Sequence, residues 1–218
     1  MKIETLEVAG FLPALKGMRN PKNSWDKGDT VEYADSIVFK NEYVTNVDIG
    51  DADMKLAKTL IKGGKEHAKF LRQIMVWADI DMPRYWWSEF DTYKIGTTAN
   101  SCSTMHKLMT TDISYSDFEF DGEDSDIISS ILYRLRYMQM LYKDAETQQQ
   151  KDMLLKRAKS ILPEGFLQLR TVNINYQQLM NIYHQRKNHR LKKEWVDTFC
   201  RWCESLPYFK ELCIDTVE

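Results

Sequence analysis

The sequence IMVWADIDMPRYWWSEFDTYKIGTTANSCS, residues 74–103, decides the fold of this chain. It opens with β-branched and aromatic residues that predict a strand over residues 74–80. Pro83 is expected in the first turn of the helix that follows, because that position does not need an amide proton. The segment therefore predicts a central strand that passes directly into a helix.

The helix after Pro83 is expected to have two chemically different faces. Helical spacing separates its aromatic side chains from its charged and hydroxyl side chains, and the two sets are Trp86 and Phe90 against Arg84, Ser88 and Asp91. Gly96 is expected to end the helix, and small hydroxyl residues follow it. Polar groups among large aromatic rings favour a ligand pocket, and the alternative is a core helix with a solvated face and a polar loop.

The composition predicts a single globular domain over residues 1–218. The chain is 43% hydrophobic and 28% charged, and it is long enough to bury a core. A net charge of −2 gives no reason to expect nucleic acid or an anionic membrane as a partner. No apolar run approaches the roughly 20 residues of a membrane span, and the N-terminus lacks the apolar segment of a secretion signal. A cytoplasmic protein is therefore expected.

Two sequence features each show only part of a metal-binding pattern. Cys200 and Cys203 form a CxxC pair, but they lie inside a helical pattern and no second metal-binding pair accompanies them. Residues 117–126 are acidic, but they lack the ligand spacing of a calcium loop and are expected to form a solvated loop. No metal site is predicted, and the thiols are expected to be reduced.

The remaining periodicities predict an α+β fold with long helices in the second half of the chain. Asp51 and Asp53 are expected to cap a helix that ends at residues 63–64. The other predicted elements are strands at residues 1–8 and 36–39, a polar loop at 19–29, a helical turn at 66–71, and helices at 11–18, 127–141, 148–162, 176–185 and 191–206.

Residues 173–190 concentrate polar side chains near the end of a predicted helix. Asn181 and Gln185 are neighbours on one helical face, and Arg186 follows them before an expected break at residues 187–188. A guanidinium at this position can hold a phosphate or an enolate-like oxygen through two hydrogen bonds. His184 and His189 could act as acid–base groups. The alternative is an exposed basic junction between two helices.

Two blocks of this sequence resemble the flavin-dependent (complementing) thymidylate synthases. Residues 162–195, LPEGFLQLRTVNINYQQLMNIYHQRKNHRLKKEW, match the family's later block without gaps, and residues 67–71, HAKFL, are similar to its H-x-S-F-L-E-H motif. The resemblance implies the family's fold, with a small antiparallel sheet and long helices. It also implies homotetramers whose active sites combine residues from several subunits.

The resemblance implies a role for individual residues of this sequence. Arg186 falls on the arginine that binds and activates the uracil of dUMP, and is therefore the expected catalytic residue. The expected nucleotide-binding residues are Glu89, Ser101, Ser103, Lys159 and Arg186. The expected cofactor-binding residues are His67, Tyr93, Lys94, Thr97, Asn175 and Asn181. The implied cofactors are FAD and folate, and the implied reaction is methyl transfer to dUMP.

The chain departs from the family's pattern at its flavin-binding motif. A gapless count places R-H-R-x-x-S on residues 92–97, TYKIGT, where only Lys94 and Thr97 keep the chemical type. Glu89 replaces a glutamine that contacts the nucleotide, and Gln177 replaces an arginine. Three hypotheses follow: a divergent enzyme, a nucleotide-binding protein with lost or altered catalysis, and a structural or interaction protein that reuses the fold. Such divergence fits a phage or mobile element.

Overall fold

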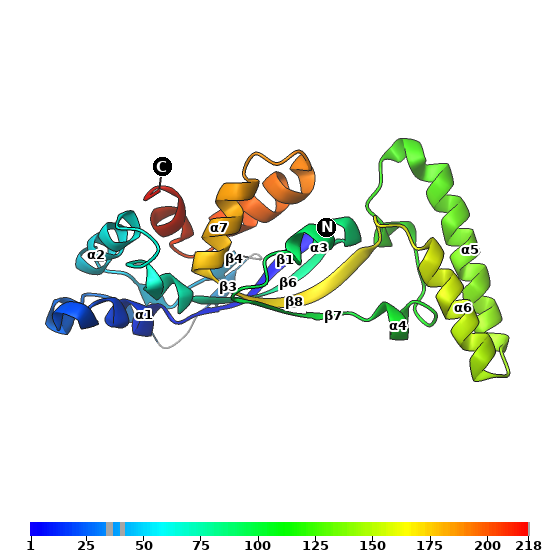
Figure 1. The fold of residues 1–218 in the computed structure, drawn as a ribbon, viewed down its shortest axis with the longest axis horizontal. Coiled ribbons are helices and arrows are strands. Elements are labelled where there is room, and N and C mark those ends of the chain that lie inside the picture. The colour runs from blue at the N-terminus through cyan, green and yellow to red at the C-terminus, as the bar shows by residue number, and fades with distance from the viewer. Residues whose placement is uncertain (34–36, 40–41, 218) are drawn as a thin grey trace. The chain divides into compact units, whose positions relative to one another are not determined.

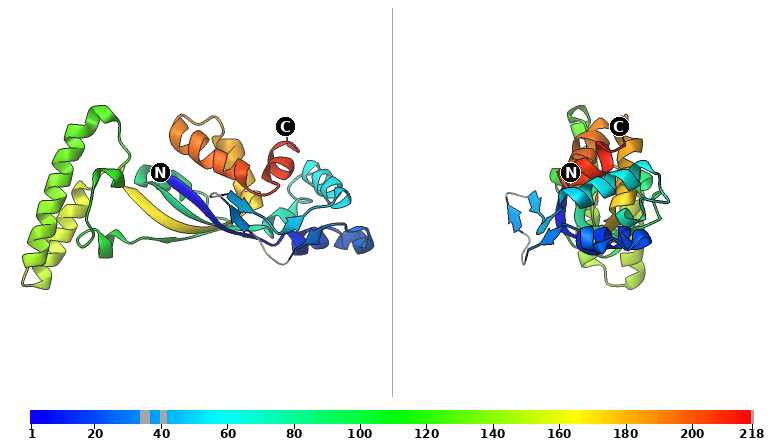
Figure 2. Two further views of the ribbon diagram at one scale, coloured as in Figure 1. Left: turned by 180° about the vertical axis from the view of Figure 1, so that it is seen from behind. Right: turned by 90° about the vertical axis from the view of Figure 1, so that its left-hand side faces the viewer.

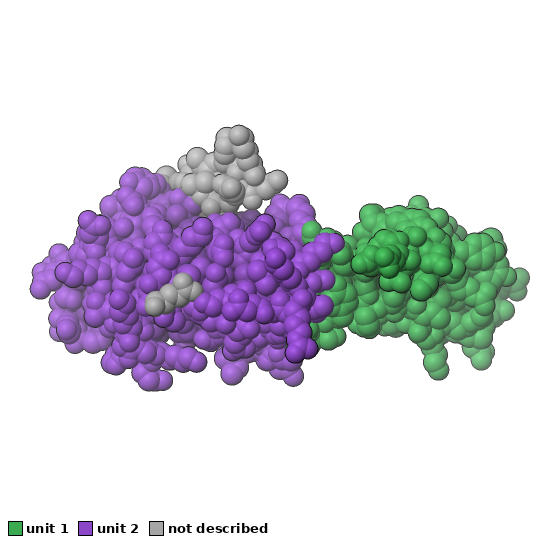
Figure 3. Space-filling model, turned by 90° about the horizontal axis from the view of Figure 1, so that it is seen from above, with its two compact units in different colours: residues 1, 81–91, 100–170 green, residues 2–80, 92–99, 171–218 purple. Residues whose placement is uncertain are grey.

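The computed structural model describes residues 1–33, 37–39 and 42–217. These residues form two compact units, coloured separately in Figure 3. Unit 1 contains residues 1, 81–91 and 100–170, and unit 2 contains residues 2–80, 92–99 and 171–218. Among the described helices, none is long and apolar enough to cross a membrane.

The main sheet has four antiparallel strands in the order β1-β6-β8-β7. These strands are β1 (Lys2–Ala9), β6 (Met75–Pro83), β7 (Thr97–Ser101) and β8 (Leu167–Asn175). Two small antiparallel sheets pair β2 (Val31–Glu32) with β5 (Val47–Asp48), and β3 (Ile37–Phe39) with β4 (Glu42–Val44). Strand β6 alternates strictly, because Val76, Ala78, Ile80 and Met82 are buried while the residues between them are only partly buried.

Helices α1 (Phe11–Met18), α2 (Asp51–Lys62) and α7 (Tyr176–Arg186) belong to unit 2 (Figure 1), and aromatic rings join α1 to α7. The Phe11 ring meets the Tyr176 ring edge to face, with centroids 5.6 Å apart. The core continues into the C-terminal helices, which are the π-helix η6 (Lys192–Cys200), α8 (Arg201–Ser205) and the π-helix η7 (Lys210–Ile214). The Trp195 and Phe199 side chains of η6 are fully buried.

A buried ion pair holds the N-terminal part of unit 2 together. Arg19 Nε donates to Asp53 Oδ1 at 2.6 Å, and the side chains are only 5% and 4% exposed. The other oxygen of Asp53 accepts hydrogen bonds from the Thr30 hydroxyl and from the amides of Asp29 and Thr30. Asp29 in turn accepts from the amides of Ala52 and Asp53. The predicted capping of α2 by Asp51 and Asp53 is therefore wrong, because Asp29 caps this helix.

In unit 1, helices α5 (Ser125–Asp144) and α6 (Gln148–Ile161) pack side by side as a hairpin, visible in Figures 1 and 2. Ile128, Leu132, Leu135 and Met138 form the buried stripe of α5. The same helix fastens the preceding chain segment through buried Gln139, whose amide donates to the carbonyls of Leu108 and Thr111. Unit 1 also contains α3 (Arg84–Phe90) and the short α4 (Thr104–Lys107).

The predicted α+β fold with a small antiparallel sheet and long helices is confirmed. The helices predicted at 11–18, 51–62, 127–141, 148–162 and 176–185 are present, as is the first strand. Residues 97–101 form a strand, whereas the sequence suggested either a ligand pocket or a polar loop there. Residues 167–175 form a strand that was not predicted. Pro83 ends β6 instead of starting the helix. Residues 37–39 of the strand predicted at 36–39 form β3, and residue 36 lies outside the described residues.

Candidate functional site

A hollow of about 290 Å³ opens beside helix α3 in unit 1, and we call it the polar cleft. Its lining is almost entirely charged or hydrogen-bonding, and consists of Arg84, Trp87, Ser88, Asp91, Thr104, Lys159, Glu164, Gln168 and Arg170. Arg84, Ser88 and Asp91 are the polar face predicted for this helix. The other face is core, because Trp86 and Phe90 are buried and stack with ring centroids 4.8 Å apart.

Arg170 is the most firmly positioned cation of the polar cleft. Its guanidinium lies over the Trp87 ring, 4.1 Å from the centroid. It donates to Asp91 Oδ1 at 2.8 Å and to Gln168 Oε1 at 3.1 and 3.3 Å. The Trp87 indole N–H donates to the Gln168 carbonyl at 2.8 Å. Trp87 and Gln168 therefore fix the orientation of the Arg170 guanidinium plane.

The other two cations of the polar cleft are less constrained. Arg84 reaches Glu164 Oε1 at 3.2 Å and the Leu162 carbonyl at 3.4 Å. Lys159 Nζ lies 3.2 Å from the Met105 sulfur, and it has no carboxylate partner among the described residues. The cleft holds three cations but only two carboxylates. The positive charge of Lys159 is therefore available to attract an anion.

Arg186, the last residue of α7, is held in unit 2 by aromatic side chains. Its Nε donates to the Tyr93 hydroxyl at 2.9 Å, and this hydroxyl donates to Gln185 Oε1 at 3.0 Å. The guanidinium carbon lies 4.5 Å from the Trp195 ring centroid and 5.5 Å from that of Tyr93. The structure thus brings together two predicted site residues, Tyr93 and Arg186, that are far apart in sequence.

The predicted cofactor residues Asn175 and Thr97 lie beside Gly96 in unit 2. Gly96 has a φ of +71°, and a Cβ there would overlap the Asn175 amide, so this turn requires glycine. Asn175 caps α7 by accepting from the Gln178 amide at 2.9 Å. The buried Thr97 hydroxyl has no hydrogen-bond partner in the described part of the chain. Lys94 is exposed.

The remaining predicted site residues do not gather with these groups. His67 is exposed and lies against Gly63, and Asn181 is half-buried on α7. Glu89 is half-buried on α3, outside the lining of the polar cleft. Ser101 is exposed at the end of β7, and Ser103 caps α4 by accepting from the Met105 amide.

Arg170 and Gln168 complete the polar cleft and were not predicted as site residues. Both belong to strand β8, which was not predicted, and their i, i+2 spacing places them on one face of it. Prediction of a strand for LQLRTVNIN would have placed these two side chains on the same face of the sheet.

The buried cysteines are not candidates for chemistry in this structure. Cys200, Cys203 and Cys213 are buried. Burial raises the pKa of the Cys200 thiol to about 12, and it also raises those of Cys203 and Cys213. Within the described residues, no group of three or more histidine, cysteine or acidic side chains is placed to hold a metal ion.

Comparison with known proteins identifies the fold. No protein-family model and no curated protein sequence matches this chain. A structure of the flavin-dependent thymidylate synthase ThyX from Helicobacter pylori complexed with FAD and dUMP matches with a TM-score of 0.68 and 16% identity, over 100% of both chains. A second structure of that protein with the same ligands has a TM-score of 0.69 and 16% identity, over 100% of this chain and 99% of the other. The chain therefore has the fold of a flavin-dependent thymidylate synthase.

Proposed function

We propose that this chain binds a pyrimidine deoxynucleotide such as dUMP, with the phosphate in the polar cleft. The charge balance of the cleft carries the proposal, because Lys159 lacks a carboxylate partner among the described residues while Arg84 and Arg170 are already paired. A phosphate would supply the missing negative charge and accept from Lys159 and the Thr104 hydroxyl, and from the Ser88 hydroxyl in exchange for its hydrogen bond to the Arg84 carbonyl. The dUMP bound by the structurally similar Helicobacter pylori protein supports this choice of ligand.

The base of the nucleotide is proposed to meet Arg186. A planar guanidinium held by Tyr93 and Trp195 suits the oxygen of a pyrimidine, because it can stabilise negative charge that develops there. We propose that Arg186 reaches the nucleotide from a neighbouring copy of the chain, in a homotetramer of the kind that the family resemblance implies. Glu89, Ser101 and Ser103 would then contribute further contacts to the nucleotide.

The reaction that the resemblance implies is methyl transfer to dUMP from folate, with reduction supplied by a flavin. The residues at the expected flavin motif fit this cofactor poorly. Lys94 is the only cation within residues 92–97, and the hydroxyl of Tyr93 already bonds to Arg186 and Gln185. A flavin pyrophosphate normally needs several such donors. We therefore assign no catalytic step to a flavin in this chain.

This poor fit favours a second candidate function, a nucleotide-binding protein whose reaction has been lost or changed. The replacement of a neutral glutamine by Glu89 also points this way, since a carboxylate accepts hydrogen bonds where an amide could donate. The two candidates share the nucleotide and differ in the cofactor. A flavin absorbance spectrum in the purified protein would support the enzyme, and its absence together with nucleotide binding would support the second candidate.

Calorimetric titration with dUMP and with deoxyuridine tests the proposed phosphate site. We expect dUMP to bind at least about tenfold more tightly, which corresponds to one charge-assisted hydrogen bond. Lys159→Met should remove most of that difference. Lys156→Met is the matched control, because Lys156 is exposed on the same helix and does not line the cleft. Equal binding of both ligands by the wild type, or no binding of either, would contradict the proposal.

A further inference from the structure

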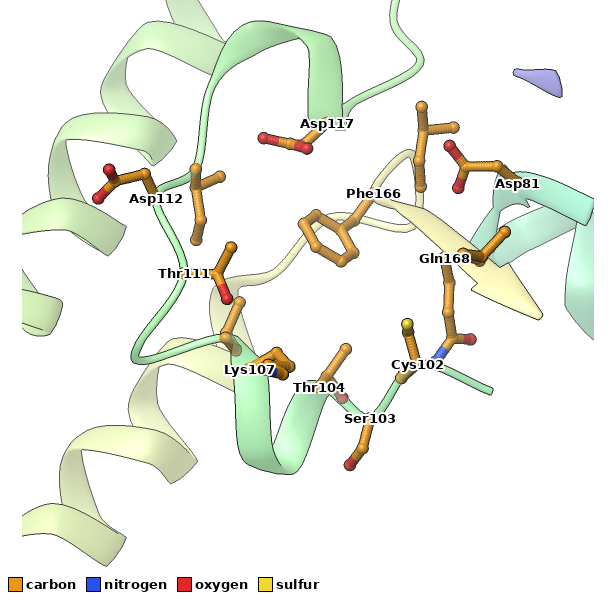
Figure 4. Close-up of a pocket in the computed structure, with 14 residues that line it drawn as sticks. Asp81, Cys102, Ser103, Thr104, Lys107, Thr111, Asp112, Asp117, Phe166 and Gln168 are labelled. Carbon is orange, nitrogen blue, oxygen red and sulfur yellow. Dashed lines mark hydrogen bonds between the residues drawn. The ribbon is translucent and has the colours of Figure 1, made fainter. Parts of the chain in front are cut away.

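A small hollow of about 190 Å³ lies beside helix α1 in unit 2, and we call it the arginine pocket. Its lining shares no residue with the polar cleft of unit 1. It also shares none with the cavity of about 460 Å³ in Figure 4, which adjoins that cleft through Thr104 and Gln168. None of the residues to which the resemblance gives a role lines it. The arginine pocket is therefore a separate candidate for a ligand.

The buried guanidinium of Arg19, in the wall of this pocket, has more donors than the protein satisfies. Its Nε donates to Asp53 Oδ1 at 2.6 Å and its Nη1 to the Ser24 carbonyl at 3.3 Å. No other acceptor engages its five N–H groups within the described part of the chain. Asp53 has no capacity to spare, because its other oxygen already accepts three hydrogen bonds. Since buried donors without acceptors cost free energy, Arg19 favours a ligand that brings an acceptor into the pocket.

The charges of the lining favour a ligand with a single negative charge. Two cations, Arg19 and Lys16, stand against one carboxylate, that of Asp53. Lys16 is exposed, and no described carboxylate lies within ion-pair distance of it. A doubly charged phosphate would exceed this balance and would be repelled by Asp53. A carboxylate matches the balance, and its planar shape matches the two parallel N–H groups of a guanidinium end.

The rest of the arginine pocket is apolar and offers a flat surface. Leu12, Leu15 and Trp25 contribute to its lining. The Trp25 side chain is 48% exposed, and its indole N–H donates to Asn20 Oδ1 at 2.8 Å. This hydrogen bond fixes the orientation of the indole while its surface stays open. An aromatic ring can pack on such a surface.

We propose that the arginine pocket binds a small aromatic monocarboxylate. Its carboxylate accepts from the free N–H groups of Arg19 and lies near the Lys16 ammonium, and its ring packs against Trp25. The volume of about 190 Å³ is below that of sites for drug-sized ligands, so the ligand must be small. The proposal rests on unit 2 alone and holds whether or not the polar cleft binds a nucleotide.

Titration with benzoate and benzamide tests the proposal, because the two molecules share a shape and differ in charge. The probe is the NMR signal of the Trp25 indole N–H, assigned as the signal that Trp25→Phe removes. We expect benzoate to shift this signal and to bind at least about tenfold more tightly than benzamide. Lys16→Met should weaken benzoate binding about twofold to fivefold, as for an exposed charge. Lys22→Met is the matched control, since Lys22 is exposed nearby in sequence but does not line the pocket, and it should bind benzoate like the wild type.

Four outcomes would overturn the proposal. Benzoate could leave the Trp25 signal unchanged up to about 10 mM. Benzamide could bind as tightly as benzoate, or Lys16→Met could bind benzoate as tightly as Lys22→Met. Inorganic phosphate could displace benzoate at equal concentration, which would make the pocket a general anion site. The other indole signals should keep their positions in both lysine variants, so that weaker binding is not a loss of folding.

Discussion

The Tyr93 hydroxyl accepts a hydrogen bond from Arg186 Nε at 2.9 Å and donates its own proton to Gln185 Oε1 at 3.0 Å. Gln185 and Arg186 are consecutive residues of α7, so one phenol fastens the end of this helix to the segment that precedes β7. Tyr93 lies within residues 92–97, where the sequence resemblance implies a flavin-binding motif. Its contact with Arg186 orients the guanidinium of that arginine.

Truncation of Arg186 should weaken nucleotide binding without unfolding the protein. We expect Arg186→Ala to weaken dUMP binding by about 1.5–3 kcal/mol, the range for a charged hydrogen bond. Arg186→Lys should restore little, because a point charge cannot reproduce the planar guanidinium. Calorimetric titration of the three proteins measures this. Equal affinity of wild type and Arg186→Ala would remove Arg186 from the site.

Tyr93→Phe should have a smaller effect that depends on Arg186. The substitution removes the hydroxyl that accepts from the Arg186 guanidinium and donates to Gln185, and neither bond is proposed to touch the nucleotide. We therefore expect dUMP binding to weaken by only about 0.5–1.5 kcal/mol. Because Tyr93 acts through Arg186, the substitution should cost almost nothing in an Arg186→Ala background. The double-mutant cycle measures this coupling. Additive effects of the two substitutions would show that Tyr93 acts on the nucleotide by another route.

FAD should bind weakly to this chain. Each charge-assisted phosphate contact contributes about 1.5–3 kcal/mol to binding. If this chain lacks two of the contacts that a complete Arg-His-Arg motif would make, its affinity for FAD should be about two orders of magnitude lower. Quenching of flavin fluorescence on titration gives the dissociation constant. Submicromolar affinity would contradict the expectation and would restore an ordinary flavin enzyme as the first candidate.

The buried pair of Arg19 and Asp53 should be the most sensitive electrostatic contact of unit 2. Arg19→Met leaves the buried Asp53 carboxylate without its cation, so we expect a loss of about 3–5 kcal/mol in the free energy of unfolding. Urea denaturation measures this loss. Asp51→Asn is the control, since Asp51 is exposed at the start of the same helix, and it should change stability by less than about 0.5 kcal/mol. Similar stabilities of the two variants would contradict this account.

The long helices could be predicted from the sequence because their buried residues recur at helical spacing. In α5, the stripe of Ile128, Leu132, Leu135 and Met138 is both the sequence signal and the packed face. Strand β7 was missed because TTANS is almost entirely exposed at the edge of the sheet and so has no alternation. Strand β8 was missed because its apolar positions change phase, with Leu167 and Leu169 at odd positions and Val172 and Ile174 at even ones.

The candidate site was predictable only where its residues are neighbours in sequence. Arg186 could be selected as a candidate because Asn181 and Gln185 precede it on the predicted helix and mark a polar helix end. The contact of Arg186 with Tyr93 joins residues that are 93 positions apart, and no local pattern encodes it. The stacking of Arg170 on Trp87 is likewise a product of tertiary structure.

The pH dependence of stability should reveal Asp81, a half-buried residue at the end of β6 whose carboxyl forms no hydrogen bond or ion pair within the part of the chain that the structure describes. Burial raises the pKa of this carboxyl in the folded protein above its value in the unfolded chain. Ionisation of Asp81 therefore costs more free energy in the folded state than in the unfolded chain. This unfavourable contribution to stability is absent at low pH and develops as the pH rises through the raised pKa.

Asp81→Asn cannot ionise, so its thermal midpoint should equal or exceed that of the wild type at neutral pH. The difference should shrink as the pH falls below the ordinary carboxyl pKa. Thermal denaturation of both proteins across this range measures it. A variant that is less stable than the wild type at neutral pH would mean that the ionised carboxylate has a stabilising partner in the folded protein.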